Sequence, residues 1–280
     1  MTYVRKEELA EGVVLYQGDC LEVLPTLGRF DLVVTSPPYD EQRAYTEAFK
    51  GVDCFAVISA LAEGLSDGGV IVWNVADGTK DGSETGTSFR QALHATECGL
   101  RLHDTMIFEK YQAFGGSNKA YLHAFEYMFV WSKGSPKAFN PIKDKPNARP
   151  GKLESTARGG TRKDGTIPER VMRLTPDYSK RTNVWRYAVG GGDTGHPAVM
   201  PLDMASDHVF SWSNEGDHVV EPFLGSGTTG VACAKLGRKF TGIEIDPGYF
   251  DIACRRIEAA LKQPDFFIDP PKPMKQEALL

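Results

Sequence analysis

The sequence lacks the long apolar segments that mark membrane or secreted proteins. No run of about 18 apolar residues occurs in its 280 residues. The first eight residues, MTYVRKEE, lack the apolar core of a signal peptide. The sequence therefore predicts a cytoplasmic protein that does not associate with membranes.

Cysteine is scarce and unclustered. The five cysteines are far apart and form no Cys-x-x-Cys pair: Cys20, Cys54, Cys98, Cys233 and Cys254. Such spacing predicts reduced thiols rather than a disulfide framework or a zinc site. The scattered histidines add no metal-ligand spacing, so no metal site is predicted.

The chain as a whole has no excess of basic charge, but one segment has. The net charge is −5, yet residues 133–186 hold 14 Lys and Arg against 5 Asp and Glu. This segment is rich in Gly, Pro, Ser and Thr, which predicts a loop-rich insert with one short helix near 167–174. It is either a solvated insertion or a surface that contacts phosphates, and the local sign bias favours the second. The residues predicted to contact nucleic acid are Lys143, Lys145, Arg149, Lys152, Arg158, Arg162, Lys163, Arg170, Arg173 and Arg181.

The rest of the chain alternates short apolar strands with helical segments. Strand patterns occur at 13–17, 31–34, 70–75, 218–221 and 240–245, and 105–109 with 125–132 suggests an antiparallel pair. The fold class predicted is α/β: a Rossmann-like, doubly wound, mostly parallel sheet with an antiparallel hairpin at one edge, plus the basic insert. The predicted divisions are a first half at 1–132, the insert at 133–190, a second half at 191–262 and an extended tail at 263–280.

One strand ends at an unusual tetrapeptide. After the buried-strand pattern at 31–34 comes Ser36-Pro37-Pro38-Tyr39. Two consecutive prolines have no N–H groups and a fixed φ, so the strand must end there. The segment offers a hydroxyl, carbonyl oxygens and an aromatic face at the carboxyl edge of the sheet, where α/β folds bind ligands. Such groups suit an amino group on a planar ring, although a plain turn would also fit.

A glycine-rich loop lies between a later strand and helix. Gly225, Gly227 and Gly230 satisfy G-x-G-x-x-G, and Glu244 ends the next strand, where an acidic residue would bind ribose hydroxyls. A P-loop is excluded because no Lys follows the glycines. Alone, the pattern fits many nucleotide- and nucleoside-binding folds, or a tight turn with no ligand.

Together these segments resemble the S-adenosylmethionine-dependent DNA amino-methyltransferases. Ser36-Pro37-Pro38-Tyr39 looks like their catalytic motif, and the region around Gly242-Ile243-Glu244-Ile245 like their ribose-binding strand end. The resemblance implies that the cofactor is S-adenosylmethionine and that its binding residues are Asp19, His196, Pro197, Pro222, Phe223, Gly225, Ser226, Gly227, Thr228 and Glu244. One departure is Glu221, which stands where the family usually has Asp.

The motif order, with the catalytic motif first and the cofactor loop last, resembles the β class of that family. There the intervening region recognises the target sequence. The resemblance thus implies a site-specific methyltransferase that acts on double-stranded DNA, with a homodimer and a cognate restriction endonuclease as possible partners. Ser36 at the first motif position favours cytosine N4 over adenine N6, which remains the alternative.

Other classes of function are less consistent with these motifs. Carbon-5 cytosine methylation needs a Pro-Cys nucleophile, and no Pro-Cys dipeptide occurs. An NAD(P)-dependent oxidoreductase leaves Ser36-Pro37-Pro38-Tyr39 and the basic segment unexplained. A non-catalytic DNA-binding protein leaves Glu244 and the glycine loop unexplained. RNA and protein amide methyltransferases usually have the opposite motif order.

Overall fold

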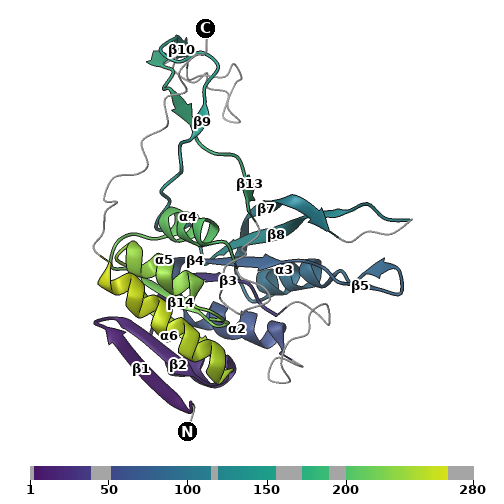
Figure 1. Cartoon of the computed structure of the whole chain (residues 1–280). Helices are drawn as coiled ribbons and strands as arrows, with labels where there is room; N and C mark the ends of the chain where they lie inside the picture. Colours follow the sequence, from purple (N-terminus) through teal and green to yellow (C-terminus); the bar gives the residue numbers. More distant parts are fainter. Residues whose placement is uncertain (1–2, 39–51, 115–118, 156–171, 189–199, 264–280) are drawn as a thin grey trace. The chain divides into compact units, whose positions relative to one another are not determined.

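The computed structural model describes residues 3–38, 52–114, 119–155, 172–188 and 200–263 (Figure 1). The chain divides into two compact units, the first within residues 1–140 and 183–268 and the second within residues 141–182. None of the helices in the described ranges has the length and apolar character needed to cross a membrane.

The first unit contains a nine-stranded sheet, counted over the described residues. Its order is β1 (Arg5–Ala10), β2 (Val13–Gln17), β15 (Lys239–Glu244), β14 (His218–Glu221), β3 (Phe30–Thr35), β4 (Leu65–Val75), β8 (His123–Ser132), β7 (Arg101–Phe114) and β13 (Val184–Tyr187). The strands from β2 to β4 are parallel. Strand β8 pairs antiparallel with both β4 and β7. The predicted doubly wound sheet with an antiparallel hairpin is confirmed.

Helices cover both faces of this sheet (Figure 1). They are α1 (Cys20–Val23), the 3₁₀ turn η1 (Leu24–Thr26), α2 (Cys54–Gly64), α3 (Thr87–Glu97), α4 (Leu202–Trp212), α5 (Thr228–Lys235) and α6 (Pro247–Lys262). On one face, a buried cluster joins α1, α2 and α3 to alternate residues of the central strands, among them Val33, Trp73 and Val220. On the other face α5 contacts both α4 and α6. Leu32, Val33 and Val34 are all fully buried. This explains the continuous apolar run in β3, because a parallel strand covered on both faces buries successive side chains.

Two strands of the nine-stranded sheet were not predicted from the sequence. Strand β1 pairs antiparallel with β2 at the sheet edge, and its residues are exposed or half-buried, so they show no clear apolar period. Strand β13 pairs parallel with β7 at the other edge and has only four residues. The predicted insert at 133–190 therefore contains a strand of the main sheet.

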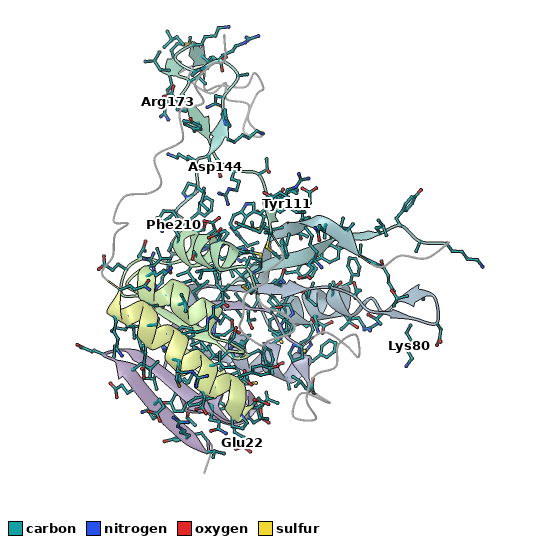
Figure 2. All side chains as sticks on the ribbon, viewed as in Figure 1. Glu22, Lys80, Tyr111, Asp144, Arg173 and Phe210 are labelled. Carbon is teal, nitrogen blue, oxygen red and sulfur yellow. The ribbon has the colours of Figure 1, made fainter. Side chains whose placement is uncertain are left out.

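The second unit is built from short antiparallel pairs. Strand β9 (Lys145–Pro146) pairs with β12 (Tyr178–Ser179), and β10 (Leu153–Ser155) with β11 (Met172–Leu174). None of the described residues within 141–182 is buried. Backbone pairing, rather than an apolar core, therefore holds the described part of this unit. Figure 2 shows two of its charged side chains, Asp144 and Arg173.

Candidate active site

The Ser36-Pro37-Pro38-Tyr39 segment begins where the central strand β3 ends. Thr35 is the last residue of β3 and is fully buried, while Ser36 is half-buried and Pro37 is buried. Strand β3 lies between β14 and β4. Ser36, Pro37 and Pro38 therefore lie at the carboxyl edge of the sheet, as predicted. Tyr39 lies outside the described residues.

The glycine loop follows the neighbouring strand. It connects β14 to α5, and Gly227 is the residue before the first turn of that helix, with φ +83°. A Cβ on Gly227 would lie 3.0 Å from the Cα of Ala253 on α6. Only glycine fits this turn without strain, because the left-handed φ and the close helix both oppose a side chain. Pro222, Ser226 and Thr228 of the loop are buried.

The side chain of Phe223 anchors the loop on the face of the sheet that α1, α2 and α3 cover. Its ring meets that of Trp73 on β4 edge to face, with the ring centres 6.2 Å apart. Its ring is also packed against the cluster beneath α2. Phe223 therefore joins the loop to the apolar core through this ring.

The predicted ribose-binding acid contacts the glycine loop. Oε2 of Glu244 accepts a hydrogen bond from the N–H of Gly225 at 2.7 Å, and its Oε1 accepts one from the N–H of Asp246 at 2.9 Å. Glu244 is 2% exposed, and burial raises its pKa to about 7. A carboxylate has about four lone-pair positions, so these oxygens can accept further hydrogen bonds.

Asp19 lies at the start of α1, beyond the end of β2. Its carboxylate is exposed and accepts a hydrogen bond from the N–H of Leu21 at 2.8 Å, so it caps this short helix. The N–H of Gly18 donates to the backbone carbonyl of Glu244 at 2.9 Å. Asp19 is thereby held beside the end of β15.

The four predicted segments come together because their strands are neighbours. Strands β2, β15, β14 and β3 are adjacent and parallel, so their carboxyl ends meet at one edge. Along this edge, Asp19, Glu244, the glycine loop and Ser36 follow one another in the order of their strands, β2, β15, β14 and β3. The chain order differs, with the first and last of these strands contributed by the N-terminal part of the chain.

Comparison with known proteins identifies the kind of protein that carries this site. The family model for N6/N4 methyltransferases, described as DNA methylase, matches residues 30–255. The chain belongs to this DNA methylase family. The orphan methyltransferase M.BamHII of Bacillus amyloliquefaciens is 42% identical to this methylase over 251 residues, which cover 86% of this chain and 90% of that protein. The type II methyltransferase M.Cfr9I of Citrobacter freundii is 26% identical over 273 residues, 88% of each chain.

Solved structures support the same fold for the methylase. The structure titled PvuII DNA methyltransferase (cytosine-N4-specific) superposes with a TM-score of 0.63 and 20% identity, covering 90% of this chain and 86% of that one. The complex of M1.HpyAVI with SAM gives a TM-score of 0.59 and 22% identity, covering 87% and 98%.

Two groups in the methylase site were missed by sequence reasoning. The Nη1 of Arg256 on α6 donates to the backbone carbonyl of Ser226 and, at 2.8 Å, to its hydroxyl. Glu221, noticed only as a departure from Asp, makes three hydrogen bonds at the end of β14. An arginine inside a helix matches no local motif, so only the tertiary structure could find Arg256.

Part of the predicted site falls on residues that the structure does not describe. His196 and Pro197 are among them, as are Arg158, Arg162, Lys163 and Arg170. Among the basic residues described in the second unit, Lys143, Lys145, Arg149, Lys152 and Arg173 are exposed. Arg181 is half-buried, and its Nε donates to Oδ2 of Asp144 at 2.7 Å. Within the described ranges, no three His, Cys, Asp or Glu side chains gather as a metal site would require.

Proposed function

We propose that this DNA methylase transfers a methyl group from S-adenosylmethionine to the exocyclic amine of a base in double-stranded DNA, with cytosine N4 as the favoured acceptor. The observation that carries the proposal is the adjacency of β14 and β3, which brings the glycine loop beside Ser36. Donor and acceptor can then be held at neighbouring strand ends.

The cofactor's expected position follows from the chemistry of the strand ends. The oxygens of Glu244 can accept the ribose hydroxyls, and Asp19 is the acid expected near the adenine. The N–H groups at the start of α5 suit the carboxylate of the methionine moiety, since a helix N-terminus favours negative charge. S-adenosylmethionine supplies an electrophilic methyl group on a positively charged sulfur.

The residues after β3 activate the acceptor. The lone pair of an exocyclic base amine is delocalised into the ring, so the amine is a weak nucleophile. The Ser36 hydroxyl and the Pro37 carbonyl accept its two N–H bonds, which concentrates the lone pair on nitrogen. Nitrogen then attacks the methyl carbon in line, the carbon–sulfur bond breaks with its electron pair on sulfur, which leaves as a neutral thioether, and the methylated amine loses one proton to water. No covalent enzyme intermediate is needed, and positioning supplies much of the rate.

The base has to leave the duplex to reach this edge. Tyr39 is the proposed stacking partner of the flipped ring. His196 and Pro197 are proposed to close over the cofactor, as the resemblance implies. The exposed basic residues of the second unit are proposed to contact DNA phosphates, because such contacts hold a duplex in register.

The choice of base depends on Ser36. A hydroxyl is a weaker acceptor than the carboxylate or carboxamide at the same motif position, which the resemblance associates with adenine. Adenine N6 is therefore the second candidate. The oxidoreductase and non-catalytic alternatives do not account for the family match to DNA methylases.

The test is transfer of an isotope-labelled methyl group from S-adenosylmethionine to unmethylated duplex DNA, followed by mass spectrometry of the nucleosides. We expect N4-methylcytosine. Replacement of Ser36 by Ala should lower kcat about 10²-fold, the usual effect of losing one preorganised polar contact to the reacting group. Ser83→Ala, on an exposed hairpin strand, is the matched control.

Each part of the proposal has an outcome that contradicts it. Methyladenine as the product would show that adenine, and not cytosine, is the acceptor base. Transfer to RNA or protein but not to DNA would overturn the DNA substrate. Equal rates for Ser36→Ala and Ser83→Ala would remove Ser36 from the catalytic residues.

A further inference from the structure

Glu221 connects three parts of the active site. It is the last residue of β14 and is 3% exposed. Its Oε1 accepts hydrogen bonds from the hydroxyl of Thr35 and, at 3.2 Å, from the N–H of Phe223. Its Oε2 lies 2.9 Å from the hydroxyl of Thr229. One side chain therefore contacts the catalytic strand, the cofactor loop and the first turn of α5.

The contact with Thr35 has a direct structural consequence. Thr35 precedes Ser36, whose hydroxyl is the proposed acceptor for the base amine. Phe223 lies within the loop that is proposed to hold the methyl donor. Glu221 thus hydrogen-bonds to Thr35, the residue before Ser36, and to Phe223 in the glycine loop.

The hydrogen-bond pattern around Thr229 indicates the protonation state of Glu221. The Thr229 hydroxyl lies 2.9 Å from Oε2 of Glu221 and 3.3 Å from the backbone carbonyl of Val34. One hydroxyl hydrogen serves only one of these acceptors well. If Glu221 is neutral, its O–H donates to Thr229, and Thr229 donates to Val34. Both contacts are then satisfied, and no buried charge remains.

The charged surroundings favour the same state. Within the described part of the chain, the titratable groups that act on Glu221 are Glu244 on β15 and the Cys233 thiol on α5, while β3 contributes the Thr35 hydroxyl. Burial, and to a smaller extent the nearby Glu244 carboxylate, raises the pKa of Glu221 to about 8. A glutamate has one more methylene than the usual aspartate, which gives this carboxyl the reach to both hydroxyls.

We propose that Glu221, in its neutral form, is a positioning residue that fixes the cofactor loop against the end of the catalytic strand. The inference rests on the proposed methyl transfer. It goes further by assigning the donor–acceptor alignment to one side chain, at a position where the family usually has Asp. A displacement of about 1 Å between reacting groups lowers a rate about 10²-fold, so loss of this connection should reduce kcat more than cofactor binding.

The experiment compares Glu221→Gln, Glu221→Asp and Glu215→Gln with the wild type. The amide of Gln has about the size of a neutral carboxyl and also offers one acceptor oxygen and an N–H donor in place of the O–H, whereas Asp is one methylene shorter. Glu215→Gln makes the same change at an exposed turn before β14 and is the control. The values of kcat, and of KM for S-adenosylmethionine, are measured from pH 6.5 to 9.

We expect wild-type kcat to fall as the pH rises through about 8, because the neutral form is lost. Glu221→Gln should keep kcat within about threefold at pH 7 and show no such fall, while Glu221→Asp should lower kcat about tenfold or more with a smaller change in KM.

A second measurement, of stability against pH, does not require enzyme activity. Because the folded state holds a proton that the unfolded state loses above pH 4.5, wild-type stability should decrease from pH 4.5 to 8, and Gln should reduce that slope.

Several results would overturn the assignment. One is a fall of kcat at alkaline pH that is the same in Glu221→Gln as in the wild type. Another is a wild-type kcat in Glu221→Asp. The third is a dependence of stability on pH that Glu221→Gln leaves unchanged. An inactive wild-type protein would instead overturn the proposed function, and the positioning role with it.

Discussion

At the scale of single residues, Arg256 shows how the glycine loop is fixed from outside. Its half-buried guanidinium donates to both the backbone carbonyl and the hydroxyl of Ser226. The proposed cofactor binding needs the N–H groups of the loop to be held in place, and α6 supplies a side chain that holds the loop. Gly227 allows α6 to approach closely enough for this contact.

We therefore expect Arg256→Met to weaken S-adenosylmethionine binding about tenfold. A charge-assisted hydrogen bond contributes about 1.5–3 kcal/mol, and about 1.4 kcal/mol corresponds to a factor of ten in affinity. Titration calorimetry measures the affinity, and circular dichroism checks the fold. The exposed neighbour Arg255→Met is the control. Equal affinities for the two variants would contradict the role of Arg256.

At the scale of elements, β7 carries two ion pairs in different environments. Lys110 Nζ lies 2.7 Å from Oε1 of Glu126, and their side chains are 15% and 7% exposed. The adjacent pair, Arg186 with Glu109, has side chains that are 54% and 36% exposed. The first pair joins β7 to β8 within the sheet, and the second joins β7 to β13. Burial, rather than distance, should decide what each pair contributes to stability.

Lys110→Met should lower the free energy of unfolding by about 3 kcal/mol, because it leaves the buried Glu126 carboxylate without its cation. Arg186→Met should cost much less, since water screens an exposed pair. Chemical denaturation of both variants gives the comparison. A similar loss for the two substitutions would mean that the Lys110 pair is no better shielded from water than the Arg186 pair.

The same elements show what local sequence patterns can predict. Strand β2 was predicted with its observed bounds, and the β7–β8 pair from its alternating apolar residues. The short edge strands β1 and β13 were missed, because an exposed edge needs no apolar period. A helix predicted near 167–174 was wrong over its described end, since Met172–Leu174 forms strand β11. Backbone pairing with residues 153–155 overrides local propensity there.

At the scale of the whole molecule, the charges are divided between the two units. The net charge of the chain is −5, yet residues 133–186 hold 14 Lys and Arg against 5 Asp and Glu. In the described part of the second unit, the side chains of this segment are exposed or half-buried. Since duplex DNA is held mainly through its phosphates, we propose that the basic segment makes the DNA contacts of this acidic protein. The strength of that binding should therefore depend on salt.

We expect the double variant Arg149→Ala/Lys152→Ala to reduce the slope of log affinity against log salt by about 2, since each lost phosphate contact removes about 0.9. Filter binding or fluorescence anisotropy at several salt concentrations measures this slope. The control is Lys235→Ala/Lys239→Ala, which removes two exposed lysines of the first unit. If the two double variants show the same slope, the basic segment does not contact DNA.

The sequence by itself determined the α/β class, the strands that carry the site and the residue types at their ends. This was possible because prolines, glycines and apolar runs act on the local backbone. Only the tertiary structure decided that β2, β15, β14 and β3 are neighbours, that Arg256 holds the glycine loop, and that Glu221 bonds to Thr35. These contacts join residues far apart in the chain, and their geometry depends on strand register and helix packing, which no local pattern specifies.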